Sequence, residues 1–245
     1  MTIVNPDPCD ILEWDTAFFG FPVARVRGDV LTRERVHQID TWCQRTGVRC
    51  LYFLARVDDA DTSRLAENND FRLVDVRMTF VHKAPNAIRN TECVASVRHA
   101  RSEDVRPLQD IVRESYHDTR FFFDTNFPRH LCESLYETWI KRSYEGYADA
   151  VLVAEIDSAA IGYISCHVNE EARTGKIGLV GVSSQARGQG VGQALVLGAL
   201  EWFSTQETQK ILVVTQGRNV PAQRLYERCG FLTQSVQLWY HKWYT

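Results

Sequence analysis

The chain has 245 residues and a formal net charge of −3 at pH 7, and it contains no basic run that would indicate a nucleic-acid surface. No stretch approaches the roughly eighteen uninterrupted apolar residues of a membrane-spanning helix, and Met1–Pro6 lacks the basic and apolar regions of a signal peptide. The seven cysteines show no Cys-x-x-Cys spacing, which favours free thiols, no metal centre and a cytoplasmic location.

The N-terminal part is predicted to form a small α/β unit over residues 1–85. It opens with the aromatic segment Leu12–Gly20, for which an apolar strand and turn is the plain structural interpretation. Apolar periodicity then predicts a helix over Thr32–Arg45 and a buried strand over Leu51–Ala55. No glycine-rich loop occurs in this unit, so we expect it to bind no cofactor.

The boundary between two units is placed at Ala84–Asn86. Pro85 disfavours helix and interrupts a strand ladder. The second unit is therefore predicted to span 92–245. It begins with a strand over Ser96–His99, followed by helices over Ser102–Tyr116 and His130–Ser143. Two strands then follow, over Ala150–Ala154 and Ala160–Cys166, joined by a turn at Asp157–Ser158.

A glycine-rich turn follows the apolar strand Ile177–Val182 and leads into a helix from about Gly188. A helix N-terminus exposes unpaired N–H groups and carries partial positive charge, so it binds an anion without needing lysine side chains. Arg187 is available for a direct phosphate contact. The sequence therefore predicts a cradle for a diphosphate, although a tight strand-to-helix turn without a ligand fits the glycines alone equally well.

Two familiar phosphate motifs do not fit this turn. A nucleotide-hydrolysing P-loop requires Gly-Lys-Ser/Thr, whereas Gly192 is followed by Gln193 and Ala194. A dinucleotide fingerprint requires a later third glycine and an acidic residue at the end of the next strand, which here ends in Thr215-Gln216.

The pattern that does fit is Gln185-x-x-Gly188-x-Gly190, which resembles the acetyl-coenzyme A loop of the GCN5-related N-acetyltransferases. A second segment, Asn219-x-x-Ala222-x-x-Leu225-Tyr226 with an exit glycine at Gly230, resembles the next helix of that family. The predicted order β-α-α-β-β-β-α-β-α-β over about 92–245 is also similar to the family's order.

The resemblance implies an α/β fold with a mixed, splayed central sheet flanked by helices, and acetyl-coenzyme A as co-substrate. The coenzyme-binding residues that it implies are Val180, Gly181, Val182, Gln185, Arg187, Gly188, Gln189, Gly190, Val191, Gly192, Asn219 and Ala222.

The resemblance also implies the chemistry. A neutral amine attacks the thioester, a backbone N–H near Val180–Val182 stabilises the carbonyl oxygen, and Tyr226 protonates the leaving thiolate. An ordinary core tyrosine is the alternative for Tyr226. No general base is assigned, because His117, His167, Glu170 and Glu171 are as readily explained as solvent-exposed side chains.

A narrower resemblance concerns the acceptor. Leu12–Gly20 and His117–Phe121 are similar to segments of the TDP-fucosamine acetyltransferase family, which acetylates the amine of a nucleotide-linked 4-amino-6-deoxy sugar. It implies a TDP-amino sugar as partner, with Arg120 at its diphosphate and Phe121 and Phe123 offering an aromatic surface. A loop packed on the core is the alternative for these aromatic residues.

The end of the N-terminal unit also echoes the end of the chain. Six positions match at one constant offset: Leu65, Glu67, Phe71, Val76, Met78 and Phe80 against Leu225, Glu227, Phe231, Val236, Leu238 and Tyr240. We hypothesise that the N-terminal unit is a decayed copy of the acetyltransferase half, with Asp70 in place of the exit glycine, and that it helps to wall the acceptor site.

Alternatives remain open for the acceptor, for the activity and for the final strand. The acceptor could be an amino acid, a polyamine or a protein amine, or the chain could be a non-catalytic acyl-coenzyme A sensor. The final strand, predicted over Thr233–Trp243, could pair across a homodimer or lie inside the chain.

Overall fold

The computed structural model describes residues 7–83, 95–116 and 119–244, and the chain divides into two compact units. Unit 1 comprises Met1–Arg77, Thr119–Leu131 and Val236–Thr245, and unit 2 comprises Met78–Asp118 and Cys132–Ser235. The predicted ranges 1–85 and 92–245 overlap these units over most of their length, but each unit also takes segments from the other range. The predicted boundary at Ala84–Asn86 lies outside the described residues.

Unit 1 is built on strands β1 (Cys9–Ile11), β2 (Val23–Val26), β3 (Cys50–Arg56) and the end of β10 (Leu232–Trp243). β1 pairs with β2 and β3 with β10 in antiparallel fashion, whereas β2 and β3 run parallel. The partner of the final strand thus lies inside the chain, at a register of Gln237 with Arg56 through Trp243 with Cys50. Of the two alternatives for this strand, the structure shows the internal one.

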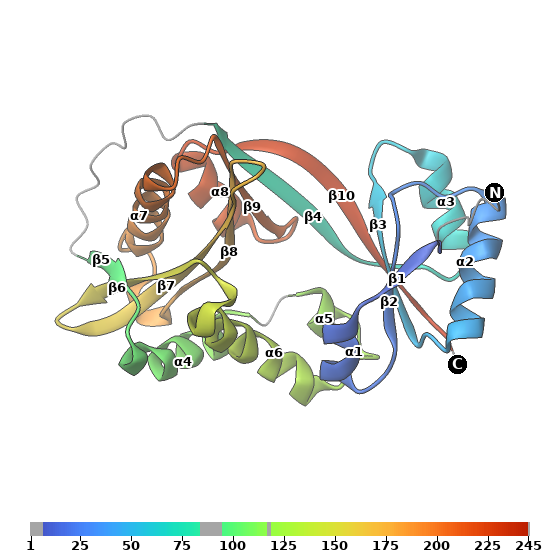
Figure 1. The fold of residues 1–245 in the computed structure, drawn as a ribbon, viewed down its shortest axis with the longest axis horizontal. Helices are drawn as coiled ribbons and strands as arrows, with labels where there is room; N and C mark the ends of the chain where they lie inside the picture. Colours follow the sequence, from blue (N-terminus) through green and yellow to red (C-terminus); the bar gives the residue numbers. More distant parts are fainter. Residues whose placement is uncertain (1–6, 84–94, 117–118, 245) are drawn as a thin grey trace. The chain divides into compact units, whose positions relative to one another are not determined.

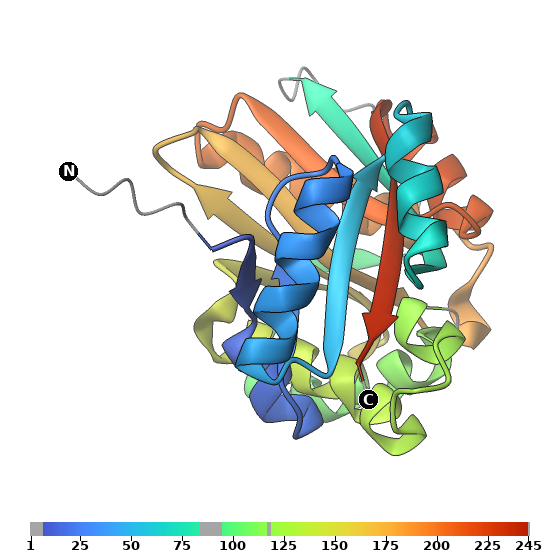
Figure 2. The same cartoon turned by 90° about the vertical axis from the view of Figure 1, so that its right-hand side faces the viewer.

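Among the described residues, the helices that lie wholly in unit 1 are α1 (Glu13–Phe19), α2 (Arg33–Thr46), α3 (Ala60–Asn68) and the short α5 (Arg120–Phe123). α2 and α3 cover one face of the strands (Figure 2), where Leu51, Phe53 and Tyr240 pack against Ile39 and Cys43. The predicted helix and strand of this unit are confirmed. The segment Leu12–Gly20 is mostly helical rather than a strand and turn, and it ends at Gly20 in a left-handed conformation.

Unit 2 has the predicted order of elements (Figure 1). They are β5 (Ser96–His99), a 3₁₀ turn (Ser102–Asp104), α4 (Val105–Ser115), α6 (Arg129–Arg142), a π turn (Ser143–Tyr147), β6 (Ala150–Ile156), β7 (Ala159–Asn169), β8 (Thr174–Val182), a 3₁₀ turn (Ser184–Ala186), α7 (Val191–Thr205), β9 (Lys210–Gln216) and α8 (Val220–Arg228). The first residues of α6 belong to unit 1.

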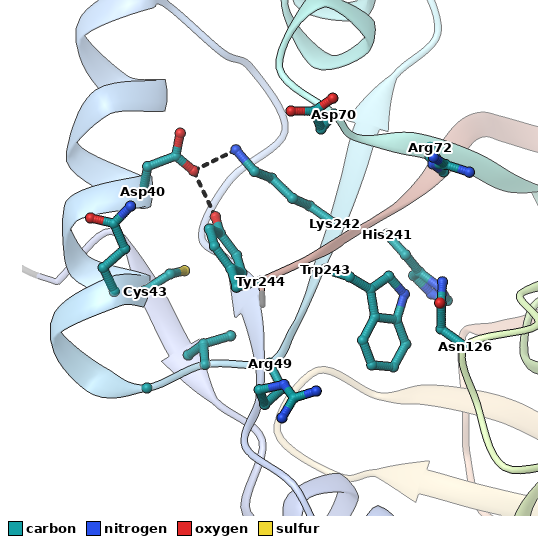
Figure 3. Close-up of a pocket in the computed structure, with 13 residues that line it drawn as sticks. Asp40, Cys43, Arg49, Asp70, Arg72, Asn126, His241, Lys242, Trp243 and Tyr244 are labelled. Atoms are coloured by element: carbon teal, nitrogen blue, oxygen red, sulfur yellow. Dashed lines mark hydrogen bonds and ion pairs between the residues drawn. The ribbon is translucent and has the colours of Figure 1, made fainter.

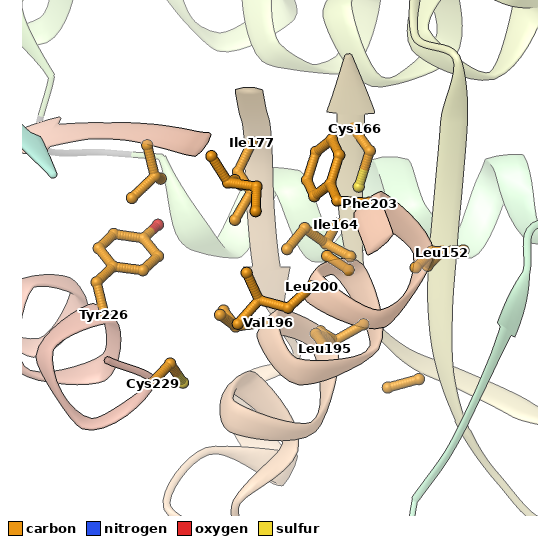
Figure 4. Close-up of a cluster of buried hydrophobic side chains, with 14 of the residues drawn as sticks. Leu152, Ile164, Cys166, Ile177, Leu195, Val196, Leu200, Phe203, Tyr226 and Cys229 are labelled. Carbon is orange, nitrogen blue, oxygen red and sulfur yellow. The ribbon is translucent and has the colours of Figure 1, made fainter. Parts of the chain in front are cut away.

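The sheet of unit 2 is mixed. β5 to β8 pair in antiparallel fashion, and β9 runs parallel to β8. α7 buries Leu195, Val196 and Phe203 against these strands (Figure 4). The predicted turn between β6 and β7 is confirmed, since Asp157 and Ser158 both have positive φ, at 49° and 64°, as in a two-residue hairpin turn. The predicted α/β class with a mixed sheet flanked by helices is confirmed.

The secondary structure repeats with a constant offset. β3 and β9, α3 and α8, and β4 (Arg72–Lys83) and β10 begin and end at residue numbers that differ by 160. The caps repeat as well: the Asp59 side chain accepts from Thr62 N–H, and the Asn219 side chain from Ala222 N–H. Asp70 and Gly230 both have positive φ, at 62° and 86°.

Among the described residues, no helix is long and apolar enough to cross a membrane.

Candidate functional site

The glycine-rich turn of unit 2 leaves the N-terminus of α7 open. Gly188 and Gly190 have φ of 78° and 81°, values that favour glycine. Gly190 is the N-cap, and no side chain caps the helix. The N–H groups of the first turn are therefore free of a side-chain acceptor and point at the position where an anion would bind.

The motif fits this turn in a second register, which sequence reasoning missed. Arg187-x-x-Gly190-x-Gly192 satisfies the same pattern as Gln185-x-x-Gly188-x-Gly190 and puts its last two residues at the start of α7. At Gly192, an added Cβ would lie 3.2 Å from Leu225 Cδ2, so this glycine lets α7 and α8 approach closely. Both patterns were present in the sequence, and only the position of the helix start separates them.

Arg187 holds the turn in place. Its Nε donates to Val182 O at 3.2 Å, and its Nη2 lies 3.4 Å from Glu114 O and 3.3 Å from Ser115 Oγ. Glu114 Oε2 also accepts from Ser184 N–H at 3.2 Å. The turn is thus fixed to the end of α4, which preorganises the open amides beyond it.

Strands β8 and β9 separate beside this turn. Their parallel pairing runs from Thr174 with Lys210 to Ile177 with Val213, whereas β8 continues to Val182. The Ser183 N–H donates to Ile161 O, on the side of β7. Successive N–H groups of a strand point to alternate sides, so the N–H groups of Val180 and Val182 point away from β7. For that reason the predicted buried strand Ile177–Val182 is only half-buried over much of this length.

Tyr116 occupies part of that opening. Its hydroxyl donates to Val180 O at 2.8 Å and accepts from Val180 N–H at 3.1 Å. The Val182 N–H has no such partner among the described residues. Behind β8, the Tyr163 ring lies where a Cβ on Gly181 would be, 2.6 Å from the nearest ring carbon. Sequence reasoning missed both tyrosines, because neither belongs to a motif and only the fold brings them to β8.

α8 presents Tyr226 at the edge of the same core. Asn219 Oδ1 accepts from Ala222 N–H at 3.2 Å, so the predicted residues Asn219 and Ala222 form the helix cap. The Tyr226 ring packs beside Phe80 and Phe231, at centroid distances of 6.0 and 5.9 Å. In Figure 4 it extends from α8 toward the side where Ile177 of β8 lies.

The Tyr226 hydroxyl is available for chemistry. The residue is 4% exposed, and no hydrogen bond to its hydroxyl is found among the described residues. The hydroxyl oxygen is not fully buried, so part of the residue's remaining exposed surface belongs to it. Burial, with a smaller effect of Tyr116, raises the pKa of Tyr226 well above its usual value. The phenol is therefore protonated at neutral pH.

No general base emerges from the candidates. His117 lies outside the described residues, and Glu170 and Glu171 are exposed in the turn after β7. Burial and the neighbouring Lys176 lower the pKa of His167, whose ring packs on Tyr147.

The predicted acceptor residues lie in unit 1 and differ in exposure. Arg120 lies over three aromatic rings, with its Cζ 4.3 Å from the Tyr52 centroid, 4.1 Å from Phe121 and 4.5 Å from Trp239. Phe121 is 2% exposed and packs in the aromatic core, whereas Phe123 is 56% exposed. Phe121 therefore supports Arg120, whereas much of the Phe123 side chain is exposed.

Unit 1 also contains a cavity of about 720 Å³ around the end of β10 (Figure 3). Asp40 Oδ1 there accepts hydrogen bonds from Lys242 Nζ at 2.6 Å and Tyr244 Oη at 2.7 Å. None of the residues predicted to bind coenzyme or acceptor lines it, but His241 of its lining contacts Arg120.

Curated relatives cover part of the chain. Spore coat polysaccharide biosynthesis protein SpsD of Bacillus subtilis is 26% identical over 140 residues, 57% of this chain and 48% of the relative. A mycothiol acetyltransferase of Streptomyces griseus is 33% identical over 88 residues, 36% of this chain and 29% of the relative. An uncharacterized N-acetyltransferase of Archaeoglobus fulgidus is 31% identical over 136 residues, 53% and 88% of the two chains. The match thus spans less than half the length of the first two relatives.

Solved structures share the fold. A GCN5-related N-acetyltransferase from Sphaerobacter thermophilus superposes with a TM-score of 0.65 at 20% identity, covering 96% of this chain and 76% of the other. A tandem GNAT protein from the clavulanic acid biosynthesis pathway gives a TM-score of 0.60 at 16% identity, covering 91% and 76%.

The family follows from a match over half of the chain. Residues 108–231 fit the sequence profile of the Acetyltransferase (GNAT) family, and this range contains the open α7 turn, the splayed end of β8 and Tyr226. The prediction of the family is confirmed. The chain belongs to the Acetyltransferase (GNAT) family.

Proposed function

We propose that the chain transfers the acetyl group of acetyl-coenzyme A to the amine of a nucleotide-linked amino-deoxy sugar. The observation that carries the acetyl-transfer part is the combination of open α7 amides, the unpaired Val182 amide of β8 and an unbonded Tyr226 hydroxyl in unit 2. The first would bind the coenzyme diphosphate, the second the thioester carbonyl and the third the leaving sulfur.

Charge development explains these roles. As the amine attacks, negative charge grows on the carbonyl oxygen, and a fixed backbone N–H stabilises it without reorganisation. Val182 offers such a donor directly, whereas Val180 offers one only if the Tyr116 hydroxyl moves aside. Val180, Gly181 and Val182 stay our predicted carbonyl-binding segment.

Tyr226 is proposed as the general acid. Collapse of the tetrahedral intermediate expels a thiolate, which leaves poorly unless it is protonated. The burial that keeps Tyr226 protonated also disfavours a free thiolate beside it. Tyr226 would give its proton to the departing thiolate, and the proton that the attacking amine loses would return to the phenolate, so that no charge stays buried. Gln185 to Gly192, Asn219 and Ala222 are proposed to hold the coenzyme in front of it.

The sugar acceptor rests on two weaker supports. Leu12–Gly20 resembles the opening of the TDP-fucosamine acetyltransferase family, and SpsD is by name a polysaccharide biosynthesis protein. Arg120 and Phe123 are proposed to contact the acceptor, with Phe121 acting beneath Arg120. A cytoplasmic location fits this substrate and is part of the proposal.

Release of free coenzyme A thiol tests the proposal. Purified protein and acetyl-coenzyme A are mixed with TDP-4-amino-4,6-dideoxygalactose, with amino acids or with polyamines, and thiol formation is followed. We expect the fastest release with the amino sugar. Fastest release with amino acids or polyamines would overturn the acceptor class, and no release with any amine would favour the non-catalytic sensor.

A further inference from the structure

Several arginines of unit 1 have no carboxylate partner among the described residues, and three of them lie near one another. Among the described residues, neither Arg25, Arg77 nor Arg120 forms an ion pair, although other arginines of the same unit do, such as Arg27 with Asp10 and Arg64 with Asp61. Guanidinium groups are seldom left unpaired when partly buried. Arg77 and Arg120 are both partly buried, whereas Arg25 is exposed.

Arg120 is held in one position. Three aromatic rings lie within 4.5 Å of its Cζ, and cation–π contacts of this kind restrict the side chain without using its N–H donors. Nη1 donates a hydrogen bond to His241 Nε2 at 2.9 Å. Most donors of the guanidinium fork remain available.

His241 and Asp124 fix that one contact. Since Arg120 can only donate, His241 Nε2 must accept, which puts the imidazole proton on Nδ1. That proton is donated to Asp124 Oδ2 at 2.7 Å, where the Trp243 indole N–H also donates at 2.9 Å. Asp124 Oδ2 thus accepts two hydrogen bonds. Asp124 positions Arg120 through a neutral histidine and does not neutralise the charge of Arg120.

Arg25 lies beside Arg120 on the same face of the sheet. Arg25 pairs in register with Tyr52, and Tyr52 with His241, so the three strands bring one cross-strand row under Arg120. Cα partners on neighbouring strands are only about 5 Å apart. Arg25 is exposed and can reach a ligand bound above Tyr52.

Arg77 completes the cluster from β4. Its Nε is buried and has no hydrogen-bond partner. β4 lies beside β10, the strand of His241, in the sheet order. Burial lowers the pKa of Arg77, and repulsion from Arg25 and Arg120 lowers it further. A buried unpaired donor is costly, and two like charges nearby add to that cost.

Asp15 is a second carboxylate beside this region, after Asp124. Asp15 accepts a hydrogen bond from Tyr52 Oη at 3.3 Å and lies beyond ion-pair distance of the arginines. Burial raises the pKa of Asp15, an effect that Arg120 and Arg25 oppose. The region therefore keeps an excess of positive charge.

We propose that Arg25, Arg77 and Arg120 form a binding site in unit 1 for the diphosphate of a nucleotide, with Asp124 and His241 positioning Arg120. Guanidinium forks match phosphate oxygens in pairs, and a diphosphate offers oxygens on two adjacent phosphoryl groups. The inference rests on the proposed function only in naming this ligand as the nucleotide part of the acceptor.

Calorimetric titration of the full chain tests the site. TDP, inorganic pyrophosphate and thymidine are titrated without acetyl-coenzyme A. We expect TDP and pyrophosphate to bind and thymidine alone to bind at least tenfold more weakly. Arg77→Gln and Arg25→Gln should each weaken TDP roughly tenfold or more, because each removes charge-assisted hydrogen bonds. Arg64→Gln, which removes an exposed charge elsewhere in unit 1, should leave TDP affinity unchanged.

Two further arms separate a specific site from general attraction. Arg120→Lys keeps the charge but loses the fork, so it should also weaken TDP. Saturating coenzyme A should not displace TDP, since its own diphosphate is proposed to bind at α7. Equal TDP affinity in Arg77→Gln and Arg64→Gln, displacement by coenzyme A, or no TDP binding would each overturn the site. The titrations contain no acetyl donor, so a failure to bind TDP would not count against acetyl transfer. Likewise, a failure to release thiol would not count against TDP binding.

Discussion

Tyr226 is the proposed general acid, and different parts of its side chain pack in the core and transfer the proton. The ring packs beside Phe80 and Phe231, while the hydroxyl has no partner in the described chain. Removing the oxygen alone therefore tests the chemistry with the packing retained.

We expect Tyr226→Phe to lower kcat by at least roughly 100-fold, the usual contribution of a general acid. The KM for acetyl-coenzyme A should stay nearly unchanged, because the α7 amides are not altered. Steady-state thiol release measures both. Tyr240→Phe, a buried tyrosine of unit 1, serves as control and should keep wild-type kcat, whereas full turnover by Tyr226→Phe would remove the residue from the mechanism.

His241 makes stability depend on pH. Burial lowers its pKa to about 4, against the opposing effect of Asp124, while an unfolded histidine titrates near pH 6.5. Between these values the unfolded chain binds the extra proton, so the free energy of unfolding falls as the pH drops from about 6.5 to 4, by roughly 3 kcal/mol.

Urea unfolding at pH 7 and pH 4 measures this loss. His241→Asn keeps a donor toward Asp124 but cannot titrate, so the wild type should lose more stability than the variant over that range. Equal losses would show that His241 is not held neutral. His82 and His167, whose pKa values burial also lowers, are present in both proteins and cancel in the comparison.

At the scale of elements, the α7 N-terminus decides where the coenzyme binds. Gln193 is the third residue of α7, where an acidic side chain normally stabilises a helix through its dipole. The same charge would repel a diphosphate bound to the first-turn amides. Stability and coenzyme affinity should therefore change in opposite directions.

Gln193→Glu is expected to raise the free energy of unfolding by about 0.3–1 kcal/mol and to weaken acetyl-coenzyme A roughly fivefold or more, since a like charge nearby costs at least ~1 kcal/mol. Urea unfolding and calorimetry measure the two effects. Gln206→Glu, at the C-terminal end of α7, should slightly destabilise the helix without changing affinity. If Gln193→Glu bound the coenzyme as tightly as wild type, the diphosphate would have to lie elsewhere.

The sequence predicted most elements of unit 2 to within a few residues, because its helices and strands have clear apolar periodicity and turns such as Asp157–Ser158 separate them. It did not predict α1, since aromatic residues over Trp14–Phe19 suit a strand as well as a helix. The separation of β8 from β9 came from the family resemblance, because it depends on pairing partners that no local pattern specifies.

Some residues of the candidate site could likewise be predicted from the sequence, and others could not. Tyr226 and the α7 glycines lie in local motifs and could be found in the sequence. Tyr116, Arg77 and the Asp124–His241 pair could not, since the last joins residues 117 positions apart. Such contacts arise only when the strands pair.

At the scale of the whole molecule, the constant offset of 160 supports the proposal that unit 1 descends from a second acetyltransferase half. The two copies differ at the helix start. α2 is capped by its own Thr32 side chain, which accepts from Arg35 N–H, whereas no side chain caps α7. The first copy has therefore lost the open amides that a diphosphate needs.

This difference predicts one acetyl-coenzyme A per chain. Calorimetric titration should give a stoichiometry near one, and the Gln193→Glu variant should weaken that single event. A second binding event of comparable affinity would mean that the N-terminal copy still binds coenzyme.

The central claim, acetyl transfer to a nucleotide-linked amino sugar, is tested most directly by identifying the product. Wild-type protein is incubated with acetyl-coenzyme A and TDP-4-amino-4,6-dideoxygalactose, and thiol release and product mass are measured together. The account predicts one N-acetylated TDP-sugar for each thiol released, and much slower reaction with the same amino sugar lacking the nucleotide. Thiol release without acetylated sugar, or equal rates with and without the nucleotide, would contradict it.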